Sequence, residues 1–125
     1  NGSKIKVSNA SEIRSAVIGF CHSGMKTEYV ERAIKIFSKL KILSSHTRQF
    51  GAAALEFCYL ASGRIDILEI SNANPYDVAA GALIAREAGA IVTDFKGKQW
   101  DLSKMDILAT NAKLHRQILN AVGNL

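Results

Sequence analysis

Residues 74–89, NPYDVAAGALIAREAG, decide the fold more than any other stretch, because they specify one helix from its start to its end. Asn74 is typical of an N-cap, and Pro75 suits the first helical position, where its missing N–H costs nothing. Asp77 then lies in the first turn, near the partial positive charge of the helix start. The small residues 79–82 allow another backbone to pack closely, and Gly89 is a natural helix stop. An acid in this place suits a metal or phosphate site; alternatively, it only complements the helix dipole, which contributes about 0.3–1 kcal/mol.

Apolar patterns alternate between strand and helix on both sides of this segment. The expected strands are residues 4–7, 16–20, 41–45, 65–70, 91–93 and 107–110, and the expected helices are residues 28–40, 52–61, 75–88 and 112–122. In the first helix, Glu28 and Arg32 are four residues apart and predict an ion pair on its exposed side. The alternation predicts an α/β fold, with a largely parallel sheet covered by helices on both faces.

Three segments follow one another in an order that resembles a known family: residues 48–69, 75–98 and 106–119. They are similar to the C-terminal half of the inositol monophosphatase family, the magnesium-dependent, lithium-sensitive sugar phosphatases. The most specific part is an aromatic residue, aspartate, an aliphatic residue and Ala-Ala-Gly at residues 76–81, followed by Glu-Ala-Gly at residues 87–89. Most members of the family have tryptophan where this chain has Tyr76.

The resemblance implies a division of the chain. Residues 1–8 are similar to the end of the hairpin that precedes this half, and residues 9–125 to the C-terminal α/β domain. The family takes most of its metal ligands from its N-terminal half, through a glutamate and an Asp-Pro-(Ile/Leu)-Asp-Gly-(Thr/Ser) motif. This chain has one proline, Pro75, and no Asp-Pro pair. We therefore expect a C-terminal fragment of a phosphate monoesterase, inactive by itself; the alternative is a non-catalytic domain that pairs with a separate N-terminal half or a partner chain.

The resemblance also implies roles for four residues, none of which carries out the chemical step itself. Asp77 matches the aspartate with which the family coordinates a magnesium ion (Mg2+), a cation that prefers oxygen ligands. Glu69 is similar to a glutamate that hydrogen-bonds a sugar hydroxyl in inositol-selective members, although it precedes Asp77 by eight positions instead of seven; alternatively, it is a carboxylate at a strand edge that faces water. Gly51 and Ala53 match backbone that approaches the substrate ring; alternatively, they serve close packing of helix and sheet.

Other residues fit chemical roles less well. Residues 19–27 have the position of a phosphate-binding loop, but Met25 separates the second glycine from the lysine that must follow it directly. Cys21 has no arginine at the distance that a phosphatase nucleophile needs, and Cys58 is expected in the core. The histidines show no metal-ligand spacing and are expected at the surface or in loops: His22, His46 and His115.

Composition and charge restrict the class of protein. The 125 residues are 48% hydrophobic and 22% charged, which is ordinary for a globular domain. The net charge of +5 comes from 16 dispersed basic residues without a recognised binding motif, so no nucleic acid is expected as a partner. No apolar run approaches about 18 residues and no signal peptide is visible, so we expect a cytoplasmic protein with no membrane partner. The expected partners are a small phosphorylated sugar or inositol and, in the full-length form, a second copy in a homodimer.

Overall fold

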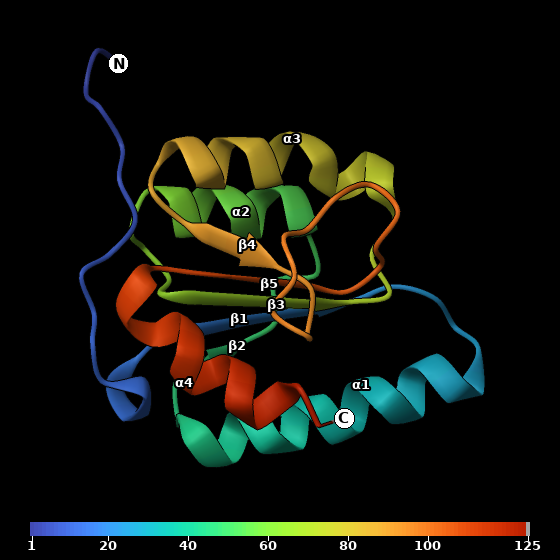
Figure 1. The fold of residues 1–125 in the computed structure, drawn as a ribbon. Helices are drawn as coiled ribbons and strands as arrows, with labels where there is room; N and C mark the ends of the chain where they lie inside the picture. Colours follow the sequence, from blue (N-terminus) through green and yellow to red (C-terminus); the bar gives the residue numbers. More distant parts are fainter. Residues whose placement is uncertain (125) are drawn as a thin grey trace.

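The computed structural model describes residues 1–124 and has three layers, with a five-stranded sheet between two pairs of helices (Figure 1). Leu125, the last residue of the predicted domain, lies outside the described residues. In chain order the elements are η1 (Ile13–Ser15), β1 (Ile18–His22), α1 (Thr27–Leu43), β2 (Thr47–Arg48), α2 (Ala53–Ala61), β3 (Ile67–Ser71), α3 (Pro75–Glu87), β4 (Ile91–Thr93), β5 (Ile107–Thr110) and α4 (Ala112–Val122). Helices α2 and α3 cover one face of the sheet, and α1 and α4 cover the other (Figure 1).

The sheet has the strand order β2-β1-β3-β5-β4 and is mixed. β1 pairs in parallel with β2 and β3, whereas β5 pairs antiparallel with both β3 and β4. Because β3 and β4 both oppose β5, four strands run in one direction and β5 alone runs in the other. The α/β class, the helices on both faces and the largely parallel sheet are confirmed, with β5 as the one antiparallel strand. A loop without a crossover helix joins β4 to β5, and only antiparallel neighbours can be joined in this way.

Two hydrophobic clusters join the layers, one on each face of the sheet. On the first face, Leu68 of β3 packs with Phe57 of α2 and Val78 of α3. On the second face, Ile67 of β3 packs with Ile36 of α1 and with the apolar side of α4. Since successive side chains of a strand point to opposite faces, residues 68 and 70 of β3 face α2 and α3, and residues 67, 69 and 71 face α1 and α4. Within residues 1–124 no helix combines the length and the apolar character that crossing a membrane requires.

The predicted strand at residues 4–7 is not formed, since residues 1–12 contain no helix or strand. Val7 donates its N–H to the carbonyl of Ala88 at 3.0 Å, which ties this segment to the end of α3. An alternating pattern is not sufficient for a strand, because another strand must supply its hydrogen-bond partners. The assignment of residues 1–8 to a preceding hairpin stays a prediction.

Helix α1 extends through Leu43, so the predicted strand at residues 41–45 is wrong. Ile42 is 85% exposed while Leu40, two positions earlier, is fully buried. Residues two positions apart lie on opposite sides of a helix but on the same face of a strand, so this difference indicates a helix. Ser44 then ends the helix and donates its N–H to the carbonyl of Leu40 at 3.0 Å. The edge strand β2 begins only at Thr47, after this stop.

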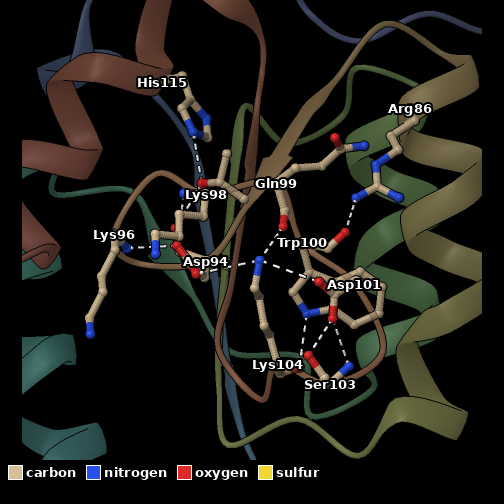
Figure 2. A network of polar contacts seen from close by, with 11 residues as sticks. Arg86, Asp94, Lys96, Lys98, Gln99, Trp100, Asp101, Ser103, Lys104 and His115 are labelled. Atoms are coloured by element: carbon tan, nitrogen blue, oxygen red, sulfur yellow. Dashed lines mark hydrogen bonds and ion pairs between the residues drawn. The ribbon is translucent and has the colours of Figure 1, made fainter.

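Two side chains lie elsewhere than predicted. Cys58 is exposed, because the buried side of α2 consists of other residues, Glu56, Phe57, Leu60 and Ala61. His115 is buried in α4: its Nε2 lies 2.9 Å from Thr93 Oγ1 (Figure 2), and its Nδ1 lies 3.0 Å from Thr110 Oγ1. The imidazole thus connects α4 to β4 and β5, and burial lowers the pKa of His115 below its ordinary value.

Candidate metal and substrate cleft

A cleft of about 490 Å³ opens where α2 and α3 begin and where β1 ends. Gly51, Ala53 and Asp77 all line it, so the fold brings together three of the four residues that the sequence singled out. Glu69 does not line it. In α/β sheets, ligands commonly bind outside the carboxyl ends of the strands, which is the position of this cleft.

Two glycines line the cleft, Gly51 and Gly81, and glycine is required at the two positions for different structural reasons. Gly51 is exposed and has a φ of +74°, a left-handed conformation that favours glycine, and nothing lies within 4 Å of a Cβ added to it. Close packing is therefore not the reason for a glycine at this position. Gly81 is the opposite case, because an added Cβ would lie 2.6 Å from the side chain of Phe57. Gly81 therefore allows α2 and α3 to approach closely beside the cleft.

Asp77 lies in the first turn of α3, as predicted, and is exposed. Asn74 fixes this turn: its Oδ1 accepts the N–H of Tyr76 at 3.1 Å, and its carbonyl accepts the N–H of Asp77 at 3.0 Å. Within residues 1–124 the carboxylate of Asp77 makes no hydrogen bond or ion pair. Its oxygens are therefore available to a cation, and carboxylate oxygen is a ligand that magnesium prefers.

Asp77 is a single ligand, however. Residues 1–124 contain no group of three or more His, Cys, Asp or Glu side chains that could hold a metal ion. Magnesium often binds proteins through only one or two carboxylates, with water and substrate phosphate at its other positions. The donor at residue 77 thus fits magnesium, while a two-metal site would need carboxylates from outside this chain.

Glu69 lies within β3, fully buried, on the face of the sheet away from α3. Ile67 and Leu108, which lie beside it on that face, belong to the cluster with α1 and α4. Burial raises the pKa of Glu69 well above its ordinary value; Asp106 raises it further, while Arg32 lowers it. The alternative of a carboxylate that faces water is wrong. Contact of Glu69 with a sugar hydroxyl stays a prediction that this placement does not favour.

Glu56 is a buried acid that the sequence analysis missed, and it lies beside the thiol of Cys21. Its Oε1 accepts the N–H of Phe50 at 3.3 Å. Burial, together with the neighbouring Glu56, raises the pKa of Cys21 to about 12. Cys21 lines the cleft but stays protonated at neutral pH, so it does not act as a nucleophile. The sequence feature that could have indicated a buried acid is that Glu56 is the one charged residue in the otherwise apolar helix predicted at residues 52–61.

His22 is a second cleft residue that the sequence analysis missed. It is the last residue of β1 and is half-buried, and its Nδ1 has no hydrogen-bond partner within residues 1–124. The sequence feature that indicates it is a polar residue at the carboxyl end of an apolar run, because the carboxyl ends of parallel strands meet at one edge of the sheet.

A second hollow of about 730 Å³ lies between α3 and the loop that joins β4 to β5. Charged groups in and beside it are already paired (Figure 2): Arg86 donates to the carbonyl of Trp100 at 2.5 Å, and Lys104 Nζ lies 3.4 Å from Asp101 and 3.7 Å from Asp94. These contacts hold the loop against the helix. The cleft at Asp77 is therefore the stronger candidate site.

Comparison with known proteins supports a family assignment. The chain matches the model of the inositol monophosphatase family over residues 1–125. The Nus factor SuhB of Vibrio cholerae is 35% identical over 122 residues, which cover 98% of this chain and 46% of that protein. The fructose-1,6-bisphosphatase/inositol-1-monophosphatase of Thermotoga maritima is 30% identical over 125 residues, which cover 100% of this chain and 46% of that protein.

Solved structures agree with these matches. An inositol monophosphatase of Thermotoga maritima superposes with a TM-score of 0.86 at 31% identity, covering 99% of this chain and 46% of that one. The staphylococcal inositol monophosphatase IMPase-II, solved with inositol monophosphate bound, has a TM-score of 0.80 at 25% identity, covering 98% of this chain and 48% of that one. The chain thus spans about half the length of the relatives that it matches. Since the family model matches the whole sequence and these structures share its fold, the chain belongs to the inositol monophosphatase family.

Proposed function

We propose that this chain is the C-terminal part of a magnesium-dependent phosphatase that hydrolyses a phosphate monoester of inositol or a related sugar. Membership of a family of hydrolases supports the reaction type. The bound inositol monophosphate of the staphylococcal relative supports the substrate class. The observation that carries the proposal is that the exposed carboxylate of Asp77 shares one cleft with Gly51 and Ala53, at the start of two helices.

Asp77 would be one ligand of the magnesium ion, and the rest of the protein would supply the others. When bound, such an ion lowers the pKa of a coordinated water and neutralises charge on the phosphoryl group. The first turn of α2 has no side-chain cap, so its backbone N–H groups would be available to the phosphate, and the starts of both α2 and α3 contribute partial positive charge to the same cleft. Asp77 and the two helix starts thus act on the same end of the substrate.

The inositol or sugar ring would lie against the wall that Gly51 and Ala53 form. Because nothing lies within 4 Å of a Cβ added to Gly51, a ring can approach the backbone there. A larger side chain at Ala53 would reduce the space in the cleft and raise KM for a bulky leaving group. This wall would then distinguish substrates by the shape of the ring.

The test is the Asp77→Asn variant of the complete protein that contains this chain, with phosphate release from inositol 1-phosphate measured over a range of magnesium concentrations. Asparagine keeps the size of the side chain but removes its charge, so we expect kcat to fall about 100-fold and the half-saturating magnesium concentration to rise. Glu87→Gln is the matched control, because Glu87 is an exposed acid on the same helix outside the cleft. Turnover of Asp77→Asn at the level of the control would contradict the metal role.

A second function is supported by the apolar outer side of α2 and α3. Four large side chains on these helices are exposed: Leu55 at 42%, Tyr76 at 93%, Leu83 at 59% and Ile84 at 41%. The relatives are about twice as long as this chain, so this surface is proposed to pack against the remaining part of the protein. The isolated chain is then a non-catalytic domain that binds the other half. A homodimer of the complete protein and a cytoplasmic location stay predictions.

To test this second function, the isolated chain is mixed with the separately expressed remainder of the protein, and co-elution and phosphatase activity are measured. We expect a complex with activity, and no magnesium-dependent activity from the isolated chain. Leu83→Asp, on α3, is expected to prevent the complex, whereas Ile42→Asp, also exposed but on α1, is expected to leave it intact. Robust hydrolysis by the isolated chain would exclude the second function.

A further inference from the structure

The loop between β3 and α3, residues 72–74, is held by groups from distant parts of the chain. Asp106 Oδ1 accepts the N–H of Asn72 at 3.2 Å, and Asn72 Nδ2 donates to the carbonyl of Ser23 at 2.7 Å. Ala73 donates its N–H to the carbonyl of Met105 at 2.6 Å. The end of β1 and the start of β5 therefore hold this loop from two sides.

Asp106 is itself held by α1. Arg32 donates from Nη1 to Oδ1 of Asp106 at 2.8 Å and from Nη2 to Oδ2 at 2.7 Å, a bidentate pair. The guanidinium also lies over the ring of Phe95, 5.5 Å from its centroid. The side chains of Arg32 and Asp106 are 36% and 26% exposed, so water only partly screens the pair. Bidentate geometry of this kind fixes the direction of the carboxylate as well as its position.

The held loop leads directly to Asp77. Three residues separate the end of β3 from the first residue of α3, so the chain has little slack there. Asn72 adopts a φ of +57°, a left-handed conformation that is uncommon outside glycine and that its hydrogen bonds to Asp106 and Ser23 support. Asn74 then caps α3 and fixes the turn that contains Asp77. The place where α3 starts, and with it the carboxylate of Asp77, follows from the position of the loop.

We propose that the ion pair of Arg32 with Asp106 positions Asp77 in the cleft, by holding Asn72 and the loop that begins α3. The proposal rests on the proposed function of Asp77 as a magnesium ligand. Neither Arg32 nor Asp106 lines the cleft, so both are positioning residues that act through the backbone of the loop. Their effect is on metal affinity and turnover, beyond any effect on the stability of the domain.

Three variants of the complete protein separate the parts of this arrangement. Asp106→Ala removes both the partner of Arg32 and the acceptor of the Asn72 N–H, and we expect it to raise the half-saturating magnesium concentration about tenfold. Asp106→Asn keeps an oxygen for the Asn72 N–H and is expected to have a smaller effect. Arg32→Lys keeps the charge but not the bidentate geometry, and is also expected to be intermediate.

The matched control is Asn111→Ala, which removes the N-cap of α4 and destabilises the domain away from the loop. Thermal unfolding midpoints of both variants are measured beside the magnesium titrations. If Asp106→Ala lowers the midpoint as Asn111→Ala does, but leaves half-saturating magnesium and kcat unchanged, the pair is only structural and the proposal is wrong.

Amide hydrogen exchange gives a measurement that does not need activity. In Asp106→Ala we expect faster exchange of the N–H groups of Asn72, Tyr76 and Asp77 than in the parent protein, with no such change in Asn111→Ala. Unchanged exchange at these three amides would overturn the proposal. Absence of magnesium-dependent activity in the parent protein would instead count against the proposed function, so the two failures are distinguishable.

Discussion

Glu69 and Asp77 lie on opposite sides of the central sheet, although only eight positions separate them in the sequence. Glu69 faces α1 and α4 from within β3, whereas Asp77 lies in the first turn of α3. Helix α3 covers the face of the sheet opposite to α1 and α4 (Figure 1). One acid is fully buried and the other is exposed in a cleft.

Glu69→Gln is expected to change how stability depends on pH. Burial raises the pKa of Glu69 in the folded state, so the folded protein holds this proton more tightly than the unfolded chain does. The contribution of Glu69 to the free energy of unfolding is therefore complete below the ordinary glutamate pKa of about 4.3, and it is lost as the pH rises through the raised pKa of the folded state. The glutamine variant stays neutral and is expected to be the more stable protein at pH 8, as measured by urea denaturation.

The control for this prediction is Glu87→Gln, which removes an exposed acid. Its stability is expected to follow that of the parent protein from pH 5 to pH 8. A Glu69→Gln variant with the same pH profile as the parent would show that Glu69 is not buried in protonated form.

His115→Gln is expected to act at the acidic end of the pH range. Burial lowers the pKa of His115, so the unfolded chain takes up this proton more readily than the folded protein. Stability is therefore lost as the pH falls through the ordinary histidine value of about 6.5. Glutamine cannot take up a proton, so the loss of stability between pH 7 and pH 5 is expected to be smaller. His46→Gln, at an exposed position, is the control and is expected to keep the parent's profile.

Gly81→Ala is expected to destabilise the domain even though alanine favours helices over glycine. The new Cβ would lie 2.6 Å from the side chain of Phe57, so α2 and α3 would have to separate. Overpacking of this kind costs about 1–3 kcal/mol of unfolding free energy, which exceeds the gain in helix propensity of about 1 kcal/mol at most sites. Urea denaturation measures the difference, and a more stable variant would contradict the close approach of the two helices.

The two cysteines are expected to differ in reactivity. Cys21 is buried with its pKa raised to about 12, whereas Cys58 is exposed. At pH 7.5, iodoacetamide is expected to modify Cys58 in the folded protein and to leave Cys21 unmodified, as measured by mass spectrometry of peptides. In urea both are expected to react. Modification of Cys21 at the rate of Cys58 in the folded state would contradict its burial beside Glu56.

Local signals predicted those elements whose ends are marked by the sequence itself. Asn74, Pro75 and Gly89 bracket α3, and the predicted helix differs from the observed one by a single residue. The predicted strands at residues 91–93 and 107–110 and the predicted helix at residues 112–122 are confirmed. A glycine precedes the first strand, the second strand is an apolar run, and Asn111 caps the helix. Caps and turn residues act through neighbouring backbone groups, so they are visible without knowledge of the fold.

Features that depend on residues far apart in the sequence could not be predicted from local patterns. The exposed side of α1 predicts a pair between Glu28 and Arg32, but Arg32 pairs with Asp106, which is 74 positions away. The apolar pattern of α2 is nearly continuous, so it did not show that Glu56 is buried and Cys58 is exposed. Alternation along β3 divides its residues into two sets without showing which set faces the cleft. Each of these facts follows only when the layers are assembled.

Strand β5 is synthesised last but occupies a place between β3 and β4. While the ribosome has not yet released it, both neighbours keep open edges that can pair with other chains. A nascent polypeptide that stops before residue 107 therefore lacks an inner strand of its sheet and is expected to be cut rapidly by protease and to recruit chaperones. The sheet of this domain can therefore be completed only after residues 107–110 have left the exit tunnel.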